Sequence, residues 1–333
     1  MNPQPPGLGP HCVGVRVVVR RVLPGLTGPT GGPAMTDVLG VMESWDATST
    51  TVRDAAGVVT RIELADIVSG KPVPPRPSVR LRVAPGEAER RALDAWPAPV
   101  TEPLGAWTLR AADGYSTRAN SVLAAGDPEA PFDEAVDRVR GFYAAHDLPA
   151  CAQVVVGSEE HERFERAGWV SARPGEADTV FEMTSVAAAS RAAHRLAPAD
   201  APALTIDPTV GPGWLADDER ALACGAAATA VLEGPSEVGF VALGDPVVAK
   251  ARVALTDGDM DPWSGISNVW VDPGHRRRGL GVAAVAAALE WSAERGATTV
   301  FLQTRGENTG ALALYDRLGF VEHHRYRYLA PPR

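Results

Sequence analysis

The fold is decided by the stretch Val269-Trp-Val-Asp-Pro-Gly-His-Arg-Arg-Arg-Gly-Leu-Gly281, in which an apolar strand runs into a basic turn that opens a helix. Gly279 and Gly281 carry no Cβ, so the backbone there can approach a ligand closely. The helix that follows offers unpaired N–H groups and the positive end of its dipole, and the arginines at 276–278 add fixed positive charge. The stretch therefore predicts a binding loop for an anion.

Composition limits the class of protein. The 333 residues are too many for one small core and predict two or three domains. The content of 45% hydrophobic and 22% charged residues is typical of a soluble globular protein. The net charge of −9 argues against a broad nucleic-acid-binding surface. We therefore expect no nucleic-acid partner, and any basic site must be local.

Cysteine spacing and apolar runs bear on where the protein works. Cys12, Cys151 and Cys224 are far apart and follow no CxxC spacing, which predicts reduced thiols in a cytoplasmic protein and no metal site. No apolar run reaches the roughly 20 residues needed to cross a bilayer, so we expect no membrane contact.

The N-terminal part of the chain predicts a small β domain. Residues 1–10 are rich in proline and glycine and are predicted to be disordered. Residues 11–75 predict a small β-barrel, because short strands alternate with turn residues. The predicted strands are 16–23, 38–44, 50–53 and 58–64. Val73-Pro-Pro-Arg-Pro77 would be a stiff linker out of the barrel.

Residues 76–190 and 191–333 each predict alternating strands and helices. In the first piece we expect strands at 106–110 and 153–156 and helices at 132–146 and 159–167. In the second we expect helices at 282–295 and 308–318 and strands at 238–243, 247–255, 266–271, 298–304 and 320–328. Residues 185–203 are rich in alanine and proline without a β pattern, and are interpreted as the connection between two halves.

The two halves contain a repeat. Phe164-Glu-Arg-Ala-Gly-Trp-Val170 matches Tyr315-Asp-Arg-Leu-Gly-Phe-Val321 position by position. Seven residues can match by chance, but the shared order of helix, strand, helix, glycine and strand around them favours a duplication. The first half has no Arg-x-x-Gly-x-Gly loop and has Phe164 where the second has Tyr315. We therefore expect the second half to be catalytic and the first to be a degenerate scaffold.

Residues 238–328 resemble the GNAT superfamily of N-acetyltransferases, which use acetyl-coenzyme A. Four features carry the resemblance, in family order: Arg276-x-x-Gly279-x-Gly281 after a strand, the next helix, Asn308, and Leu314-Tyr315 before Leu318-Gly319-Phe320. The resemblance implies an α/β (α+β) fold of tandem GNAT-like mixed sheets flanked by helices, behind the small β-barrel. The chain looks like an actinobacterial tandem subfamily, some members of which are labelled N-acetylglutamate synthase.

The resemblance also implies a role for individual residues. Strands 266–271 and 298–304 would splay apart to admit coenzyme A, with the pyrophosphate on N–H groups of 277–282. Tyr315 would be the catalytic residue that protonates the departing thiolate, and Asn308 would hydrogen-bond the pantetheine arm or the strand beside it. A backbone N–H near 269–270 would stabilise the oxyanion. The expected cofactor-binding residues are Val269, Trp270, Val271, Arg276, Arg277, Arg278, Gly279, Leu280, Gly281, Val282, Asn308 and Tyr315.

The general base is not identified by the sequence. Asp257, Asp259 and Asp261 lie in a turn, and Ser267 and Asn268 lie on the strand itself. None of them stands out, and a chain of waters needs no dedicated residue.

Three other features keep two interpretations each. Thr117-Arg-Ala-Asn-Ser121 is either a turn that satisfies its own backbone or part of an acceptor pocket between the halves. Alternation along the last strand places His324, Tyr326 and Tyr328 on one face. These three side chains either pack in the core or border the acceptor site. Trp263 and Trp270 either belong to the core or to a pocket wall, or they contact the acceptor.

The leading functional hypothesis is an N-acetyltransferase that transfers an acetyl group from acetyl-coenzyme A to a small-molecule or peptide amine by direct attack in a ternary complex. No cysteine lies near the loop, which argues against a covalent acyl-enzyme. The alternative is an acyl-coenzyme A-binding regulatory or interaction protein with a non-catalytic GNAT fold. In that case the barrel would contact a protein partner.

Overall fold

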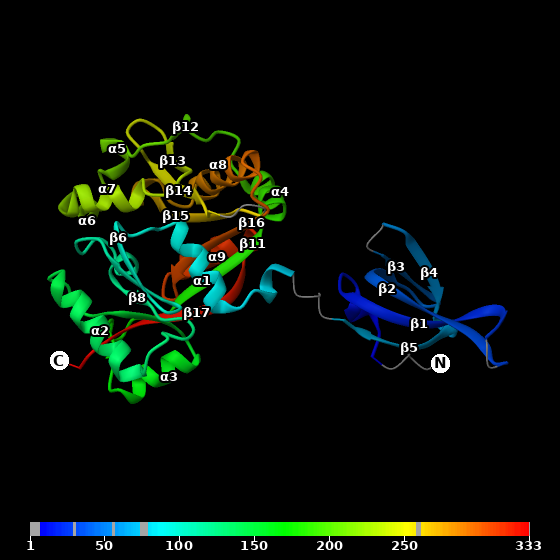
Figure 1. Cartoon of the computed structure of the whole chain (residues 1–333). Coiled ribbons are helices and arrows are strands. Elements are labelled where there is room, and N and C mark those ends of the chain that lie inside the picture. Colours follow the sequence, from blue (N-terminus) through cyan, green and yellow to red (C-terminus); the bar gives the residue numbers. More distant parts are fainter. Residues whose placement is uncertain (1–6, 29–30, 55–56, 74–78, 258–260, 333) are drawn as a thin grey trace. The chain divides into compact units, whose positions relative to one another are not determined.

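The computed structural model describes residues 7–28, 31–54, 57–73, 79–257 and 261–332, and the chain divides into two compact units between Ser78 and Val79. The N-terminal unit, blue in Figure 1, is an antiparallel sheet in the order β4-β3-β2-β1-β5. Its elements are η1 (Pro10–Cys12), β1 (Arg16–Thr27), β2 (Pro33–Trp45), β3 (Ser49–Arg53), β4 (Val59–Glu63), η2 (Leu64–Asp66) and β5 (Ile67–Pro72).

The small β-barrel predicted at the N-terminus is confirmed as a barrel-like sheet. Alternate side chains of its strands, such as Val17 and Met42, are buried in one core. Leu8 is also part of this core, so the prediction of disorder for 1–10 is wrong there, while residues 1–6 lie outside the described residues. Residues 74–77 of the predicted linker lie outside them as well.

The C-terminal unit begins with η3 (Val79–Arg82) and α1 (Pro85–Asp94), and its first half then alternates strands with helices. These elements are β6 (Val100–Leu104), β7 (Trp107–Ala111), η4 (Arg118–Asn120), β8 (Val122–Leu123), α2 (Phe132–Ala145), β9 (Ala152–Val155), α3 (Glu159–Arg166), β10 (Val170–Ser171) and β11 (Thr179–Ser185).

The second half opens with α4 (Val186–Leu196), which replaces the irregular connection expected at 185–203. Ser185 caps this helix by accepting the N–H of Ala188, and alanine favours helix strongly. The remaining elements are β12 (Leu204–Asp207), α5 (Pro212–Leu215), α6 (Glu219–Cys224), α7 (Ala226–Leu232), β13 (Val238–Leu243), β14 (Ala249–Leu255), β15 (Trp263–Val271), η5 (Pro273–His275), α8 (Leu280–Glu294), β16 (Thr299–Arg305), α9 (Thr309–Arg317) and β17 (Val321–Ala330).

The two halves share one mixed sheet in the order β12-β13-β14-β15-β16-β11-β17-β9-β8-β7-β6. β11 belongs to the first half of the sequence, yet it pairs on one side with β16 and on the other with β17. The far end of β17, from Tyr326 onward, pairs with β9 of the first half. The predicted halves at 76–190 and 191–333 therefore exchange strands, and neither sheet is complete without the other half.

The repeated heptapeptide adopts the same local structure in both halves. Gly168 and Gly319 each follow a helix with φ near 80°, a conformation that glycine adopts without strain. The N–H of Trp169 donates to the carbonyl of Phe164, and that of Phe320 donates to the carbonyl of Tyr315, both at 3.0 Å. The shared helix ending supports the interpretation as a duplication.

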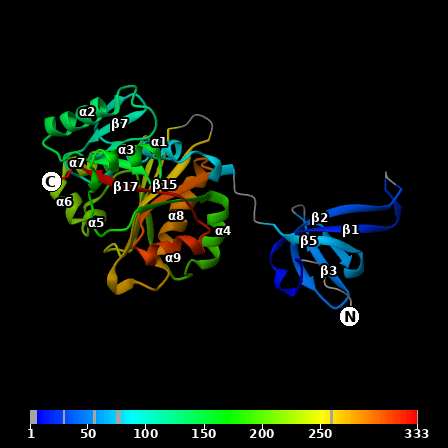
Figure 2. The same cartoon turned by 90° about the horizontal axis from the view of Figure 1, so that it is seen from below.

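Helices cover both faces of the sheet around β15 and β16. α8 packs on β13, β14 and β15 with α4 beside it, as Figure 2 shows from below. The opposite face is covered by α1, whose alanines pack against Phe181 and Trp263. In the described part of the chain, no helix is long and apolar enough to span a bilayer.

Candidate active site

The parallel strands β15 and β16 pair over only part of their length. Their pairing runs from Trp263 with Thr299 to Ile266 with Leu302 and stops there. The first four residues of β15 are buried and the next five are half-buried. The two strands therefore splay beyond Ile266 and Leu302, and β15 presents a backbone edge that β16 does not pair.

A β-bulge lies at the point where the strands separate. Lys250 pairs with Trp270 and Arg252 with Ser267, so Asn268 and Val269 face one residue of β14. Asn268 adopts φ 51°, which few residues other than glycine favour. Such a bulge takes backbone donors out of the sheet ladder. The predicted oxyanion donor near Val269 lies at this bulge.

Side-chain alternation gives the splayed region two different sides. Leu302 packs in the core under α8, and side-chain alternation along β16 places Thr304 on the same side, near Tyr315 of α9. Gln303 and Arg305 line a pocket on the opposite side. A molecule bound on the helix-covered side and one bound in the pocket would meet where β15 and β16 separate.

The glycine loop begins α8 on the helix-covered side. Gly279 caps the helix with φ 79°, and Arg277 also has a left-handed φ of 63°. Before the loop, Asp272 accepts the N–H of Gly274 and the His275 ring at 2.8 Å, and the His275 hydrogen bond lowers the pKa of this carboxyl. Side chains 276–278 are exposed, so their charge faces solvent around the first amides of the helix.

Not all predicted cofactor-binding side chains face the loop. Leu280 and Val282 are buried in the core, so only their backbone N–H groups are available to a ligand. Trp270 points away from Val269 and Val271, toward the ammonium of Lys250. The structure thus brings together the backbone of these residues rather than their side chains.

Tyr315 and Asn308 lie on α9, beside the splayed strands. Burial raises the pKa of the Tyr315 phenol, which lies near Thr304, just past the last β15–β16 pair. Asn308 caps α9 by accepting the N–H of Ala311 at 3.2 Å. Its oxygen is committed to the cap, which leaves the amide Nδ2 as its group for a ligand.

The pocket on the opposite side has a volume of about 250 Å³ and is called here the arginine pocket. It brings together residues from both halves of the unit. Its described lining residues are Trp96, Ser116, Thr117, Arg118, Arg173, Thr179, Arg220, Ser267, Asn268, Gln303, Arg305, Tyr326 and Tyr328. Four are arginines and none is acidic.

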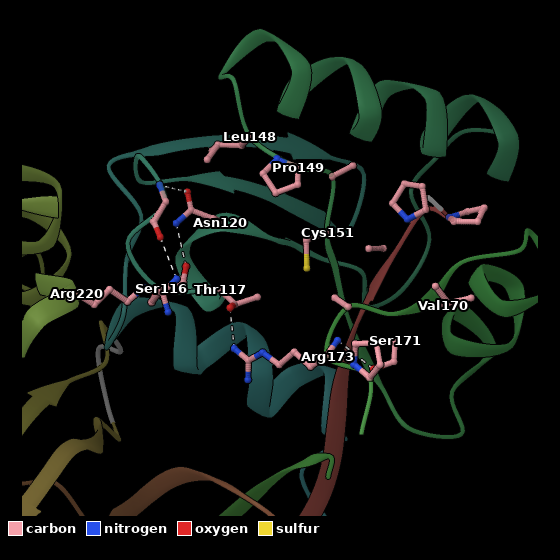
Figure 3. A pocket seen from close by; sticks show the side chains of 17 residues that line it. Ser116, Thr117, Asn120, Leu148, Pro149, Cys151, Val170, Ser171, Arg173 and Arg220 are labelled. Atoms are coloured by element: carbon pink, nitrogen blue, oxygen red, sulfur yellow. Dashed lines mark hydrogen bonds between the residues drawn. The ribbon is translucent and has the colours of Figure 1, made fainter. Parts of the chain in front are cut away.

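A larger pocket of about 940 Å³ continues from the arginine pocket, with which it shares Ser116, Thr117, Arg173 and Arg220 (Figure 3). The 117–121 segment between them fits both of its interpretations. The Asn120 side chain accepts the N–H groups of Ala112 and Gly114, so the turn satisfies its own backbone. Thr117 also lines both pockets. Burial raises the pKa of Cys151 in the larger pocket to about 12, so its thiol is protonated.

A buried carboxylate lies behind the arginine pocket. Glu89 of α1 accepts hydrogen bonds from Gln153 of β9 at 2.7 Å, Gln303 of β16 at 3.3 Å and His324 of β17 at 2.9 Å. The Tyr326 hydroxyl, which lines the pocket, donates to Gln303 at 3.0 Å. The predicted buried face of the last strand is confirmed, since His324, Tyr326 and Tyr328 are all buried.

The carboxylates considered as general base lie elsewhere. Asp257 and Asp261 precede β15 at its paired end, and Asp259 lies outside the described residues. Another acidic group, residues 217–219, lines a small pocket with Asn268 and Val269 at the bulge. Within it, Asp217 hydrogen-bonds Lys250. Sequence reasoning placed Arg118, within 117–121, at a possible acceptor pocket, but it missed this acidic group and the arginines at 173, 220 and 305, whose local sequence gives no sign that they lie near β15.

A mixed sheet that opens between two parallel strands, before a glycine-capped helix, defines the class as GNAT N-acetyltransferase. Residues 86–329 match the family model "Probable histone acetyltransferase Rv0428c C-terminal", and residues 11–71 match "Rv0428c N-terminal Sm-like domain". The first match covers more than half of the chain, which therefore belongs to this acetyltransferase family.

Related proteins agree with this assignment. The chain is 28% identical over 259 residues to the uncharacterized N-acetyltransferase YobR of Bacillus subtilis, covering 72% of this chain and 96% of that protein. The [ribosomal protein bS18]-alanine N-acetyltransferase of Escherichia coli K12 is 38% identical over 72 residues, 22% of this chain and 48% of that one. A GCN5-related N-acetyltransferase from Kribbella flavida shares the fold, with a TM-score of 0.51 and 19% identity over 74% of this chain and 95% of that one.

Proposed function

We propose that the protein transfers an acetyl group from acetyl-coenzyme A to a primary amine by direct attack in a ternary complex. The observation that carries the proposal is the splayed region, whose helix-covered side holds the glycine loop and whose other side holds a pocket. Acetyl-coenzyme A supplies the activated acyl group when bound. The amine approaches from the arginine pocket and needs no covalent acyl-enzyme.

The residues on the helix-covered side fit the pantetheine arm and the pyrophosphate of coenzyme A. The unpaired edge of β15 offers backbone groups at Val269 and Val271 to an amide-containing arm. The first N–H groups of α8, next to Gly279 and Gly281, suit a pyrophosphate, because an anion is stabilised at a helix N-terminus. Gly279 caps the helix with φ 79°, a left-handed conformation that glycine adopts without strain, so the backbone can turn into α8 at this point.

Groups of the protein then assist bond formation, bond cleavage and proton transfer at the reacting atoms. The amine nitrogen bonds to the acyl carbon as the carbon–sulfur bond breaks, and the N–H at the bulge stabilises the charge that develops on the acyl oxygen. Tyr315 gives its proton to the sulfur and regains one from solvent. The amine loses a proton to water, and carboxylates 217–219 line a small pocket at the bulge that can hold this water.

The experiment is coenzyme A release from acetyl-coenzyme A with a panel of amines, comparing Tyr315→Phe with Tyr143→Phe. Tyr315→Phe should lower kcat by about 10²- to 10⁴-fold, the usual contribution of a positioned acid, while the calorimetric Kd for coenzyme A stays unchanged. Tyr143 is also a buried tyrosine, and its hydroxyl donates to the carbonyl of Arg110 at 3.1 Å and accepts the Arg110 N–H at 3.4 Å, so its loss controls for removing a buried phenol hydroxyl. Equal rates for the two variants would remove Tyr315 from the mechanism.

Interaction through the N-terminal unit stays a prediction. Among the described residues, nine of the fourteen exposed large hydrophobic side chains belong to this unit, although it is the smaller one. This higher share of exposed apolar side chains is the observation that favours a protein partner for the N-terminal unit.

A further inference from the structure

The larger pocket has no part in the proposed reaction, although it continues from the arginine pocket, from which the amine is proposed to approach. Its volume of about 940 Å³ is more than three times the 250 Å³ of the arginine pocket. Pockets of this size that bind small molecules are lined mainly by apolar side chains, with a few polar groups that orient the ligand. The chemistry of the wall therefore indicates what this pocket binds.

Most of the wall is apolar and comes from segments that are far apart in the sequence. The loop before β9, the strand β10 with the residues after it, and the end of β17 meet around the pocket (Figure 3). Val170 is 54% exposed, so a large apolar side chain is open to the pocket. Proline adds apolar surface without a backbone N–H. The apolar wall includes Leu148, Pro149, Val170, Pro174, Pro331 and Pro332.

The polar side chains of the wall already have partners within the protein. Asn120 makes four hydrogen bonds to the backbone of residues 112–116. The Thr117 hydroxyl accepts a hydrogen bond from Arg173 at 2.7 Å, and the Arg173 guanidinium lies 3.7 Å from Glu176. A ligand in this pocket therefore meets apolar side chains and polar groups that are already engaged.

Cys151 adds a neutral group to the wall. Burial raises the pKa of its thiol to about 12, so at neutral pH the thiol is protonated and packs like a small apolar side chain. An apolar group gains free energy when it leaves water for such a wall, whereas a charged group would lose its hydration without a new partner. The pocket therefore suits an apolar group.

We propose that the larger pocket binds an apolar group of the acceptor, so that the preferred acceptor is a primary amine that carries a large apolar substituent. The inference rests on the proposed function and names the substrate class of that same site. Thr117 and Arg173 line both pockets, and the arginine pocket extends to Ser267 and Asn268 at the bulge. One molecule can therefore place its amine at the bulge and its apolar end against this wall.

The test measures coenzyme A release by the full-length protein with matched primary amines. The panel is the linear alkylamines from ethylamine to decylamine, with 1,8-diaminooctane as the partner of octylamine. kcat/KM should be nearly constant for the shortest chains and then rise about threefold to fourfold for each methylene that enters the pocket, the usual effect of burying one methylene group. Octylamine should exceed 1,8-diaminooctane by about 100-fold, because its far end is a methyl group and not an ammonium.

Two substitutions test where the apolar group binds. Ala172→Trp fills part of the pocket and Val170→Ser removes apolar surface from its wall, so kcat/KM for octylamine should fall by about tenfold and about threefold, respectively, while that for ethylamine stays the same. Both residues are exposed, so both variants should fold. Ala187→Trp is the matched control, since this exposed alanine lies on α4 and is not among the described lining residues of either pocket. The calorimetric Kd for coenzyme A should be the same in all variants.

The outcomes distinguish this inference from the proposed function. Equal kcat/KM for ethylamine, octylamine and 1,8-diaminooctane would overturn the inference and leave the acetyltransferase intact. The same would follow if Ala172→Trp changed kcat/KM for ethylamine and octylamine by the same factor. If the protein binds acetyl-coenzyme A but releases no coenzyme A with any amine of the panel, the proposed function falls and the inference falls with it.

Discussion

Replacing Glu89 with alanine should destabilise the C-terminal unit by about 3–5 kcal/mol, because three buried side-chain donors lose their shared acceptor. Glu89 is 2% exposed and its two oxygens accept three side-chain hydrogen bonds, from Gln153, Gln303 and His324. Alanine would leave these donors buried without an acceptor, at about 1–3 kcal/mol each before water enters the cavity. Because they lie on β9, β16 and β17, the loss acts where the two halves exchange strands.

The assay is urea unfolding followed by tryptophan fluorescence, which reports mainly on the C-terminal unit because seven of the eight tryptophans lie beyond residue 78. Glu87→Ala is the matched control on the same helix, since Glu87 is only half-buried and its pairs with the half-exposed Arg90 and Arg91 contribute about 0.5 kcal/mol or less each. Glu89→Gln keeps the volume and one acceptor oxygen, so it should fall between the two. Unfolding free energies for Glu89→Ala and Glu87→Ala within about 1 kcal/mol of each other would refute the reasoning.

Two further predictions concern pH and strand exchange. Burial, with Glu322 and Asp316 nearby, raises the pKa of Glu182 on β11 to about 7 from 4.5. Between these two values the Glu182 carboxyl is protonated in the folded state and ionised in the unfolded state. The free energy of unfolding therefore falls as the pH rises from about 4.5 to about 7, and this contribution is constant above that range. Glu182→Gln should therefore raise Tm at pH about 8 and leave it nearly unchanged at pH about 4; a pH-independent effect would argue against this. Residues 79–190 and 191–333 should be insoluble when expressed separately and should co-purify when co-expressed, because β11 and β17 each complete the other half's sheet; a monomeric 191–333 fragment with a cooperative thermal transition would contradict the exchange.

Local sequence patterns predicted most of the elements near the splayed strands. β13 spans 238–243 as expected, and α8 and α9 begin and end within two residues of their predicted bounds. These signals are strong because helix caps, glycine stops and apolar alternation depend on residues a few positions apart. The fifth barrel strand, α1 and β11 were not predicted.

The sequence could also identify the glycine loop but not the pocket that faces it. The loop is one continuous stretch, and its chemistry follows from its own backbone. The pocket's arginines lie at 118, 173, 220 and 305, and their convergence depends on the order of strands in the sheet. The heptapeptide repeat indicated a duplication, yet it gave no sign that the two copies exchange strands.

The sequence by itself determined one side of the splayed region: a strand, a glycine-containing turn and a helix, with Asn308 and Tyr315 following along the chain. Hydrogen bonds between near neighbours fix these backbone conformations, so they can be read from spacing alone. Only the tertiary structure decided the other side, where Arg118 and Arg220 face Asn268 across the arginine pocket and Glu89 joins three strands. Charges distant in the sequence become neighbours only when sheet order brings their strands and loops together, and that order is a property of the whole packed unit.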